Sequence, residues 1–357
     1  MKIVSFEATL HKFPLTKPYT IAYKTIFDTD IVLFELRLAN GITGFGASNP
    51  FPEVVGETPQ NTLENLQSDA LQFLIGKDIN DFQQLITAIT RLFPELPGTQ
   101  AAIDIALHDA FGKYKNISVL NIYGQKIKPL PTSITIGIKD VSEMIKEAKQ
   151  YYDQGFRILK IKTGIHIDED IERVTKISET FGSKMSIRVD ANQGYDLFTL
   201  QRFINETKKL DIELIEQPLP VAMDDELNKL DQNDKSILVA DESLINIHSA
   251  IKLAERPKPY GVFNIKLMKC GGICGARQIS EIAQKSGISL FWGCNDENIV
   301  SISAALHAAY SCENTKYLDL DGSFDIEDPF FEGGFTIKSG YMYPNELPGL
   351  GIKFKNK

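Results

Sequence analysis

The chain has 357 residues, of which 43% are hydrophobic and 24% are charged, and its formal net charge is −9. This composition is that of an ordinary globular protein, and the length suits a barrel of about 250 residues plus about 100 more. The negative charge gives no electrostatic reason to expect nucleic acid or an anionic membrane as a partner. The N-terminus has no signal-peptide core and no apolar run reaches about 18 residues, so we expect a cytoplasmic protein.

Residues 1–128 are predicted to form an N-terminal α+β capping domain. Alternating hydrophobicity and turn residues predict strands at 3–10, 31–38 and 41–47. Helical periodicity predicts helices at 61–74, 81–93 and 99–114. Two irregular stretches, near 13–25 and 49–59, are as long as loops that usually have a function. We therefore expect both stretches to be lids over a site in the rest of the chain.

Residues 129–324 carry a strand-and-helix repeat that places a charged residue at the end of each apolar strand. These charges stand at residues 162, 190, 216, 241 and 266, so the intervals are 28, 26, 25 and 25 residues. Such a period is typical of a (β/α) barrel, in which the carboxyl ends of all strands meet at one mouth. Eight strands are expected, at 132–138, 158–161, 186–189, 212–215, 237–240, 261–265, 289–292 and 317–320. The segment 325–357 is predicted to return to the capping domain.

Helices are expected between these strands, where the apolar residues recur with helical spacing. Their predicted ranges are 141–153, 169–181, 197–209, 224–230, 247–255, 275–286 and 299–310. The four cysteines all lie in the last quarter of the chain. Cys270 and Cys274 have a CxxxC spacing, which would suit a metal site or a disulfide, but packed thiols are the simpler interpretation.

Three acids, Asp190, Glu216 and Asp241, end consecutive predicted strands. Their carboxylates would repel one another unless a cation joined them, and oxygen ligands of this kind suit Mg²⁺. Each acid alone could instead be a helix cap or a solvated surface residue, as illustrated by Asp241, which precedes Ser243 at a plausible helix start. The matched spacing of all three favours the metal site.

Lysines flank the three acids on both sides. Lys160 and Lys162 share one face of the second strand, and Lys266 ends the sixth strand across the barrel. A buried lysine near a divalent cation should have a lowered pKa and can act as a base. The cation can stabilise the enediolate formed from a carboxylate substrate, so two opposed bases would permit racemisation or epimerisation.

These motifs together resemble the enolase superfamily, in its muconate-lactonizing-enzyme subgroup. The resemblance covers essentially the whole chain and implies a modified (β/α)₇β TIM-type barrel of the α/β class with an N-terminal α+β capping domain. Lys160-Ile161-Lys162 is similar to the KxK motif of the family, and residues 264–272 are similar to its sixth-strand signature. The resemblance implies that Lys162 and Lys266 are the acid/base pair and that Lys160 stabilises the anion. It further implies Asp190, Glu216 and Asp241 as Mg²⁺ ligands, with Asn192 and Glu242 supporting them, whereas Lys269 is not the base.

The substrate is predicted from weaker signals. Asp319 and Asp321, at the end of the eighth strand, resemble the DxD motif by which dipeptide epimerases hold the substrate ammonium, although Asp321-Gly322 could be a plain turn. Thr135 is similar to a substrate-contacting threonine of that group. Lys24 stands where Ala-Glu epimerases have an arginine against the glutamate side chain. We therefore expect a dipeptide epimerase acting on L-Ala-D/L-Glu, with a role in recycling peptidoglycan peptides.

Asp296 is a departure from that pattern, because relatives often have an apolar pair at this place after the seventh strand, and its acid could favour a cationic dipeptide. The competing enzyme predictions are an o-succinylbenzoate synthase, a cycloisomerase or an N-acylamino acid racemase. None of their substrates has an ammonium for Asp319 and Asp321. A non-catalytic binding protein is the remote alternative, and the resemblance leads us to expect a homo-oligomer.

Overall fold

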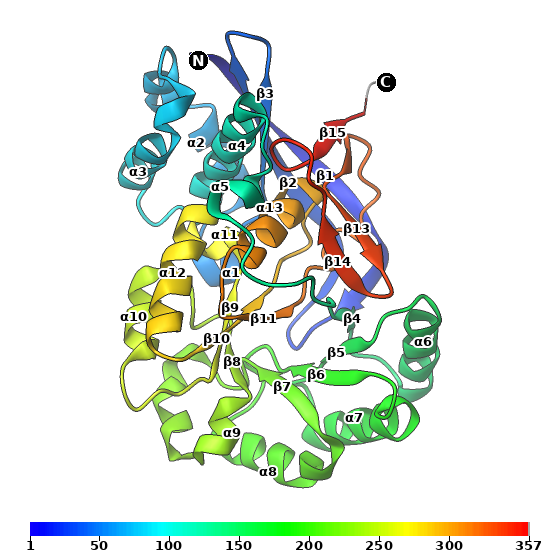
Figure 1. Cartoon of the computed structure of the whole chain (residues 1–357). Helices are drawn as coiled ribbons and strands as arrows, with labels where there is room; N and C mark the ends of the chain where they lie inside the picture. The colour runs from blue at the N-terminus through cyan, green and yellow to red at the C-terminus, as the bar shows by residue number, and fades with distance from the viewer. Residues whose placement is uncertain (356–357) are drawn as a thin grey trace.

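A three-stranded sheet with helices forms the N-terminal part of the chain, and a parallel barrel forms the larger part (Figure 1). The computed structural model describes residues 1–355. The sheet is antiparallel, in the order β1-β2-β3, with β1 at Ile3–Thr20, β2 at Thr25–Leu38 and β3 at Thr43–Ser48. The helices of this part are α1 (Pro52–Val55), α2 (Pro59–Leu66), α3 (Phe82–Leu92), α4 (Pro97–Lys115) and α5 (Val119–Tyr123). Thirteen of the 19 residues of α4 are buried, because it lies against both the sheet and the barrel.

The barrel has eight parallel strands in sequence order from β4 to β11. They are β4 (Ile134–Ile136), β5 (Ile158–Lys162), β6 (Ser186–Asp190), β7 (Ile212–Glu216), β8 (Leu238–Ala240), β9 (Val262–Ile265), β10 (Ser289–Trp292) and β11 (Thr315–Leu318). A parallel bridge between Thr132 and Leu318 closes the ring between its first and last strands. The predicted modified barrel with an α+β cap is therefore confirmed.

Helices cover the outside of the barrel, as the repeat predicted. They are α6 (Val141–Asp153), α7 (Ile167–Phe181), α8 (Leu197–Thr207), α9 (Gln232–Ser236), α10 (Ile247–Ala254), α12 (Ile273–Lys285) and α13 (Ile299–Tyr310), with the short α11 (Leu267–Cys270) before α12. The range 224–230, expected as a helix, is a 3₁₀ helix at Val221–Lys229. The last predicted strand lies two residues earlier than expected, so Asp319 and Asp321 follow β11 and are not part of it.

The first lid, expected as an irregular loop at 13–25, is instead a hairpin. Strand β1 continues to Thr20 and β2 begins at Thr25, so only four residues form the turn. The hairpin is hydrogen-bonded to the barrel loops, since Thr16 N donates to Asp325 O over 2.9 Å and Ile138 N donates to Thr20 O over 2.9 Å. A pair of hydrogen-bonded strands therefore extends from the cap to the barrel mouth.

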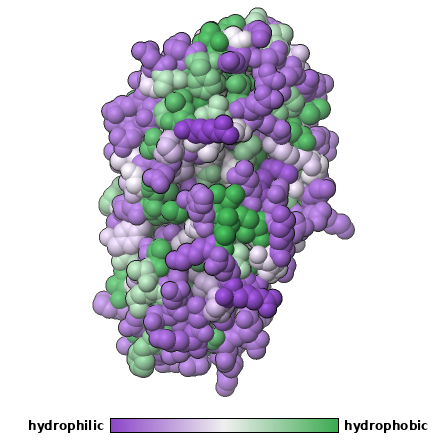
Figure 2. Space-filling view, turned by 90° about the vertical axis from the view of Figure 1, so that its left-hand side faces the viewer, coloured by the Kyte–Doolittle hydropathy of each residue, from purple (hydrophilic) through white to green (hydrophobic). Residues whose placement is uncertain are grey.

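The C-terminal segment lies against the cap, and both termini are at the same end of the molecule (Figure 1). It contains two strand pairs, β12 (Phe331–Gly333) with β15 (Ile352–Phe354) and β13 (Phe335–Lys338) with β14 (Tyr341–Pro344). The face shown in Figure 2 is mainly hydrophilic, with small separate hydrophobic patches. Within residues 1–355, no helix has the length and apolar character needed to span a membrane.

Candidate active site

A cavity of about 400 Å³ opens at the carboxyl ends of the barrel strands, beneath the hairpin. Its lining comes from barrel strand ends, from the hairpin and from the second lid at residues 49–54. Among the residues predicted for the site, the cavity is lined by Lys24, Thr135, Lys160, Lys162, Asn192, Asp241, Glu242, Lys266, Asp296, Asp319 and Asp321. Asp190 and Glu216 are not part of this lining, but both contact Lys160, which is part of it. The structure therefore brings the predicted lysines, acids and lid residues to one region.

The two lysines of β5 point into the barrel, because residues two apart on a strand share a face. Lys160 Nζ lies 2.9 Å from Glu216 Oε2, 3.1 Å from Asp190 Oδ2 and 2.7 Å from Asp319 Oδ2. Lys162 Nζ donates to Asp190 Oδ2 over 2.7 Å and to Asn192 Oδ1 over 3.2 Å. Lys160 is thus buried at the centre of the acids, and Lys162 lies at their edge near β6.

The opposite edge is formed by Lys266, which directly follows β9. Its Nζ lies 2.8 Å from Asp241 Oδ2. Lys269, from α11, contacts the other oxygen of the same carboxylate and donates to Asn264 O over 3.1 Å. Lys162 and Lys266 therefore reach the acid group through different carboxylates, Asp190 and Asp241, with Glu216 of β7 between them in strand order.

The three acids fit a hard divalent cation, because all are buried carboxylates at neighbouring strand ends. Burial raises the pKa of Glu216 to about 8, and the charge of Asp190 adds to this effect. Burial acts in the same direction on Asp190, but Lys162 and Lys160 outweigh it and lower its pKa to about 2. Glu242 Oε2 is buried without a hydrogen-bond partner among the described residues, which leaves an oxygen beside Asp241 for a cation or its water.

The lowered pKa expected for a lysine beside a divalent cation stays a prediction, and the carboxylates alone have the opposite effect on Lys160 and Lys266. Burial acts to lower the pKa of each ammonium, but the carboxylates outweigh it: Asp319 first for Lys160, and Asp241 first for Lys266. Both pKa values are therefore raised above the ordinary value. The expectation assumed a cation that neutralises these acids.

Asp319 and Asp321 lie side by side at the cavity wall but have different partners. Asp319 accepts from Lys160 and, over 2.6 Å, from Ser133 Oγ. Asp321 Oδ2 accepts from the backbone N–H of Thr135 over 2.8 Å. Burial and the charge of Asp319 raise the pKa of Asp321 to about 7, so this carboxylate would gain from an added cation.

The lid residues predicted to meet the second substrate residue are also paired. Lys24 Nζ donates to Glu53 Oε1 over 2.7 Å and lies 4.0 Å from the centre of the Phe51 ring. Asp296 Oδ2 accepts from Tyr19 Oη over 3.0 Å, and burial raises the pKa of Asp296 to about 6. The second lid is therefore tied to the hairpin by an ion pair, whereas Asp296 faces the cavity from the barrel.

Two family models match the chain. The model for the N-terminal domain of mandelate racemase / muconate lactonizing enzyme matches residues 5–124, and the model described as enolase C-terminal domain-like matches residues 143–357. The chain belongs to this family. The resemblance to the enolase superfamily is thus confirmed, and it covers both parts of the fold.

Relatives within the family include proteins named as dipeptide epimerases. The L-Lys-D/L-Arg epimerase of Desulforapulum autotrophicum is 44% identical over 99% of both chains, and the L-Ala-D/L-Glu epimerase of Bacillus subtilis is 31% identical over 99% of this chain and 97% of its own. A solved dipeptide epimerase from Methylococcus capsulatus, in complex with Mg and the dipeptide L-Arg-D-Lys, has a TM-score of 0.96 and 43% identity over 99% of both chains. The predicted epimerase class is confirmed, and the predicted Ala-Glu preference is not.

Several contacts around the family's site were not predicted from the sequence. Gln217 Oε1 accepts from the backbone N–H of Asp241 over 2.9 Å, and Asn264 Nδ2 donates to Glu216 Oε1 over 2.8 Å. Ser133 donates a hydrogen bond to Asp319. Ser133 stands two residues before Thr135, so alternation along a strand could have placed both side chains on the same face. Gln217 and Asn264 adjoin motif residues, but only the fold shows that Gln217 holds the backbone of Asp241 and that Asn264 holds the carboxylate of Glu216.

Proposed function

We propose that this protein is a Mg²⁺-dependent dipeptide epimerase whose preferred substrates carry cationic side chains. The observation that carries the epimerase proposal is the placement of Lys162 and Lys266 on opposite sides of one group of buried carboxylates. A single base would be sufficient for a cycloisomerase or a synthase. Two opposed bases are needed to take a proton from one face of a carbon and return one to the other.

Asp190, Glu216 and Asp241 would hold the cation, with Glu242 and Asn192 beside them. When bound, Mg²⁺ supplies positive charge next to the substrate carboxylate, which lowers the cost of the negative charge that develops when the α-proton leaves. Lys160, buried among the same acids, adds a second positive charge at that place. This donor set supports Mg²⁺ over a softer metal, because it contains only oxygen atoms.

The α-carbon would lie between Lys162 and Lys266. One lysine, as the free amine, takes the α-proton while the electron pair of the C–H bond moves toward the substrate carboxylate. The other lysine, as the ammonium, donates a proton to the opposite face and restores the C–H bond with inverted configuration. The exchange of roles between the two lysines makes the reaction reversible.

The N-terminal ammonium of the dipeptide is assigned to Asp321 and Asp319, with Thr135 beside them. Asp321 carries the assignment, because its raised pKa marks a buried carboxylate whose charge lacks full compensation. A cyclic or acylated substrate would leave that carboxylate with the Thr135 N–H but without a cationic partner. This favours a free dipeptide over the substrates of an N-acylamino acid racemase.

The preference for cationic side chains rests on further acidic residues of the cavity, beyond those assigned above to the cation and to the substrate ammonium. They are Asp28, Asp30, Glu53, Glu147, Asp296 and Asp325. Three lysines, Lys17, Lys24 and Lys139, line the same region. Lys24 pairs with Glu53, and Lys139 lies 2.6 Å from Glu147, so the balance around Asp296 is negative. The names of the relatives at 44% and 42% identity, both L-Lys-D/L-Arg epimerases, support this preference.

A second candidate substrate is L-Ala-D/L-Glu, which Lys24 favours. An anionic side chain could replace Glu53 as the partner of Lys24, since that pair is partly exposed and such pairs are weak. The 31% identical epimerase of Bacillus subtilis supports this candidate less strongly. Peptidoglycan recycling stays a prediction attached to it.

The test is a mass-spectrometric screen of L,L-dipeptide pools in D₂O with Mg²⁺. Epimerisation adds one deuterium at the α-carbon of the second residue, so we expect a gain of one mass unit for dipeptides containing Lys or Arg. A gain restricted to L-Ala-L-Glu and its close relatives would replace the cationic preference by the second candidate. The absence of exchange in every pool would reject the epimerase proposal.

Asp296→Asn tests the side-chain assignment. Removing this charge should lower kcat/KM for a Lys- or Arg-containing dipeptide at least about tenfold and leave L-Ala-L-Glu nearly unchanged or improved. Asp225→Asn is the matched control, because Asp225 is exposed and lies outside the cavity. Equal losses for both classes of dipeptide would show that Asp296 does not select the substrate.

A further inference from the structure

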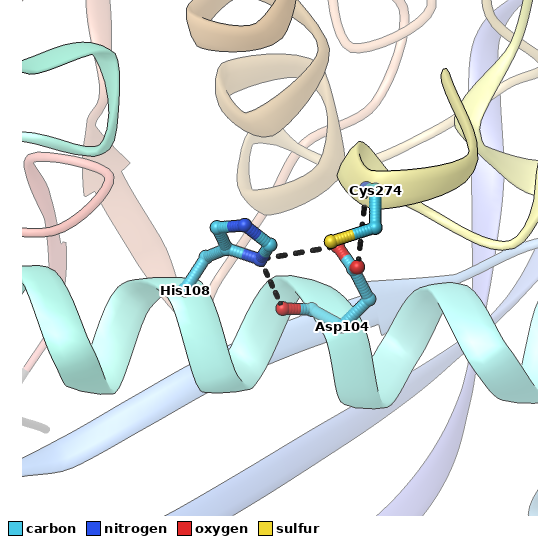
Figure 3. A group of neighbouring side chains, drawn as sticks. All are labelled: Asp104, His108 and Cys274. Atoms are coloured by element: carbon cyan, nitrogen blue, oxygen red, sulfur yellow. Dashed lines mark hydrogen bonds and ion pairs between the residues drawn. The ribbon is translucent and has the colours of Figure 1, made fainter. Parts of the chain in front are cut away.

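A polar cluster of the buried Asp104 and His108 and the partly buried Cys274 joins the cap helix α4 to the barrel helix α12 (Figure 3). One candidate ligand atom from each residue lies within 4.8 Å of the others, as a metal site would require. However, His108 Nδ1 lies 2.8 Å from the backbone carbonyl oxygen of Asp104, which can only accept, so Nδ1 carries the proton. His108 Nε2 is paired with Tyr123 Oη over 2.7 Å. Both ring nitrogens are therefore used in hydrogen bonds and neither is free for a metal.

The Asp104 carboxylate binds the first turn of α12 instead. Its Oδ1 accepts from Ile273 N over 2.8 Å, and its Oδ2 accepts from Cys274 N over 3.2 Å. These are N–H groups at the start of the helix, which have no partner within α12, and a carboxylate there also interacts favourably with the helix dipole. Asp104, a residue of the N-terminal domain, thus satisfies the first N–H groups of a barrel helix (Figure 3).

We propose that Asp104 is a positioning residue for Lys266 and Lys269, and that the cap aligns one side of the active site through it. The inference rests on the two-base reaction of the proposed function. Its first step is the Gly271-Gly272 turn between α11 and α12, where both residues have positive φ values, of 78° and 96°. A Cβ atom on Gly272 would lie 2.7 Å from Asp104, and one on Gly271 would lie 2.2 Å from Gln100 Oε1. The turn is therefore pressed against α4 and cannot shift toward it.

The second step runs from this turn to the catalytic lysine through α11. Gly272 N donates to Leu267 O over 3.0 Å, and Lys269 N donates to Lys266 O over 3.0 Å, so the four-residue helix is fixed at both of its ends. Its Lys269 side chain contacts Oδ1 of the Asp241 carboxylate, whereas Lys266 contacts Oδ2 of the same group. A movement of the turn would therefore displace Lys266 and Asp241 together. Lys162, on β5, has no such connection to α4 among these contacts.

Asp104→Asn tests this connection between Asp104 and Lys266. The amide keeps the size of the carboxylate but places an NH₂ group against Ile273 N or Cys274 N. One capping hydrogen bond is then replaced by a contact between two donors. We expect the turn and α11 to relax, which should harm proton transfer by Lys266 and spare Lys162. A displacement of a catalytic group by less than 1 Å is enough to cost about tenfold in rate.

The experiment measures α-deuterium exchange with Mg²⁺ in two single-base backgrounds, Lys162→Ala and Lys266→Ala. Each background keeps one base, so its exchange rate reports proton transfer by that lysine alone. In the intact enzyme the forward and reverse epimerisation rates are linked by the equilibrium constant, so they cannot be changed independently. Asp104→Asn should lower exchange about tenfold in the Lys162→Ala background and by less than about twofold in the Lys266→Ala background. Thermal unfolding of each variant is recorded alongside.

Asp109→Asn is the matched control, because Asp109 is also a fully buried carboxylate of α4 with two backbone donors. Its oxygens accept from Phe45 N and from Leu350 N, each over 2.9 Å, so it binds β3 and the C-terminal segment and not α12. General destabilisation of α4 should affect both backgrounds equally in this variant. A selective loss for Asp104→Asn alone would support the inference.

Equal losses in both backgrounds, or no loss in either, would overturn it. A Lys162→Ala variant without exchange, in an enzyme whose wild type exchanges, would also overturn it, since no Lys266-dependent step would remain for Asp104 to support. Absence of exchange in the wild type would instead reject the proposed function. If Asp104→Asn does not fold, Gln100→Ala removes the other side chain pressed against the turn and should give the same selective loss.

Discussion

The two lysines proposed as bases, Lys162 and Lys266, are held by different carboxylates, which makes their individual removal informative. We predict that Lys162→Ala and Lys266→Ala each lower epimerisation by roughly 10²- to 10⁴-fold, the usual contribution of a general acid or base. Each variant should still exchange the α-proton of a single diastereomer. The measurement is the initial rate from both diastereomers, with the exposed Lys149→Ala as control. Normal epimerisation by either variant would contradict the two-base mechanism.

The residues at strand ends could be predicted because their position depends only on period and alternation. Lys162, Asp190 and Glu216 are the last residues of β5, β6 and β7, as the near-constant spacing required, and Lys160 lies on the same face of β5 two residues before Lys162. The directions of the lysine pKa shifts could not be predicted in the same way. They depend on how close each ammonium lies to several carboxylates, and a sequence gives no such distances.

At the scale of elements, the hairpin shows where sequence patterns mislead. Pro14 and Pro18 interrupt the alternation after residue 10 and predicted an irregular loop. Strand β1 tolerates both prolines because it is the edge strand of its sheet, where no partner needs their missing N–H groups. The pairing with β2 shifts register between Pro14 and Tyr19, which marks the same place.

Helix α13 provides a prediction on pH dependence through His307. Burial lowers its pKa to about 4, and its Nδ1 accepts from Leu120 N of α5 over 2.9 Å. In the unfolded chain a histidine has a pKa of about 6.5, so below that pH the unfolded state binds a proton that the folded state does not. As the pH falls from about 7 to about 5, this group alone should therefore lower the free energy of unfolding by roughly 2 kcal/mol.

His307→Asn removes this titration while keeping an acceptor near the Leu120 N–H. We expect the variant to show a shallower fall in the free energy of unfolding between those two pH values than the wild type, as measured by urea denaturation. His248→Asn is the control, because His248 is exposed. An unchanged slope in His307→Asn would mean that other groups account for the acid sensitivity.

At the scale of the whole molecule, the barrel was predictable because one pattern repeats. Helices α6 and α13 and strand β10 have the predicted bounds, and most other barrel elements differ from them by only a few residues. The misses are short elements whose conformation depends on neighbours: α9, α11 and α5 have only four or five residues each. The substrate preference was harder to predict, because the acids around Asp296 come from the hairpin, α1, α6 and the C-terminal segment, which are brought together only by folding.

The family's barrel also predicts a coupling between metal and global stability. Three buried carboxylates at adjacent strand ends are costly without a cation, so Mg²⁺ should bind the folded state far better than the unfolded chain. Mg²⁺ at a hundred times its Kd should then stabilise the protein by about 2.7 kcal/mol. The measurement is the unfolding temperature with Mg²⁺ and after chelation, and chelation should also abolish α-proton exchange.

Glu216→Gln tests whether that coupling arises at the proposed site. Glu216 already favours its neutral form, because burial and Asp190 raise its pKa to about 8. The neutral amide should therefore leave the unfolding temperature without Mg²⁺ close to that of the wild type, while the increase caused by Mg²⁺ is lost. The exposed Asp225→Asn should keep the increase. If Glu216→Gln were stabilised by Mg²⁺ as much as the wild type, the cation would bind elsewhere, and the assignment of all three ligands would have to be withdrawn.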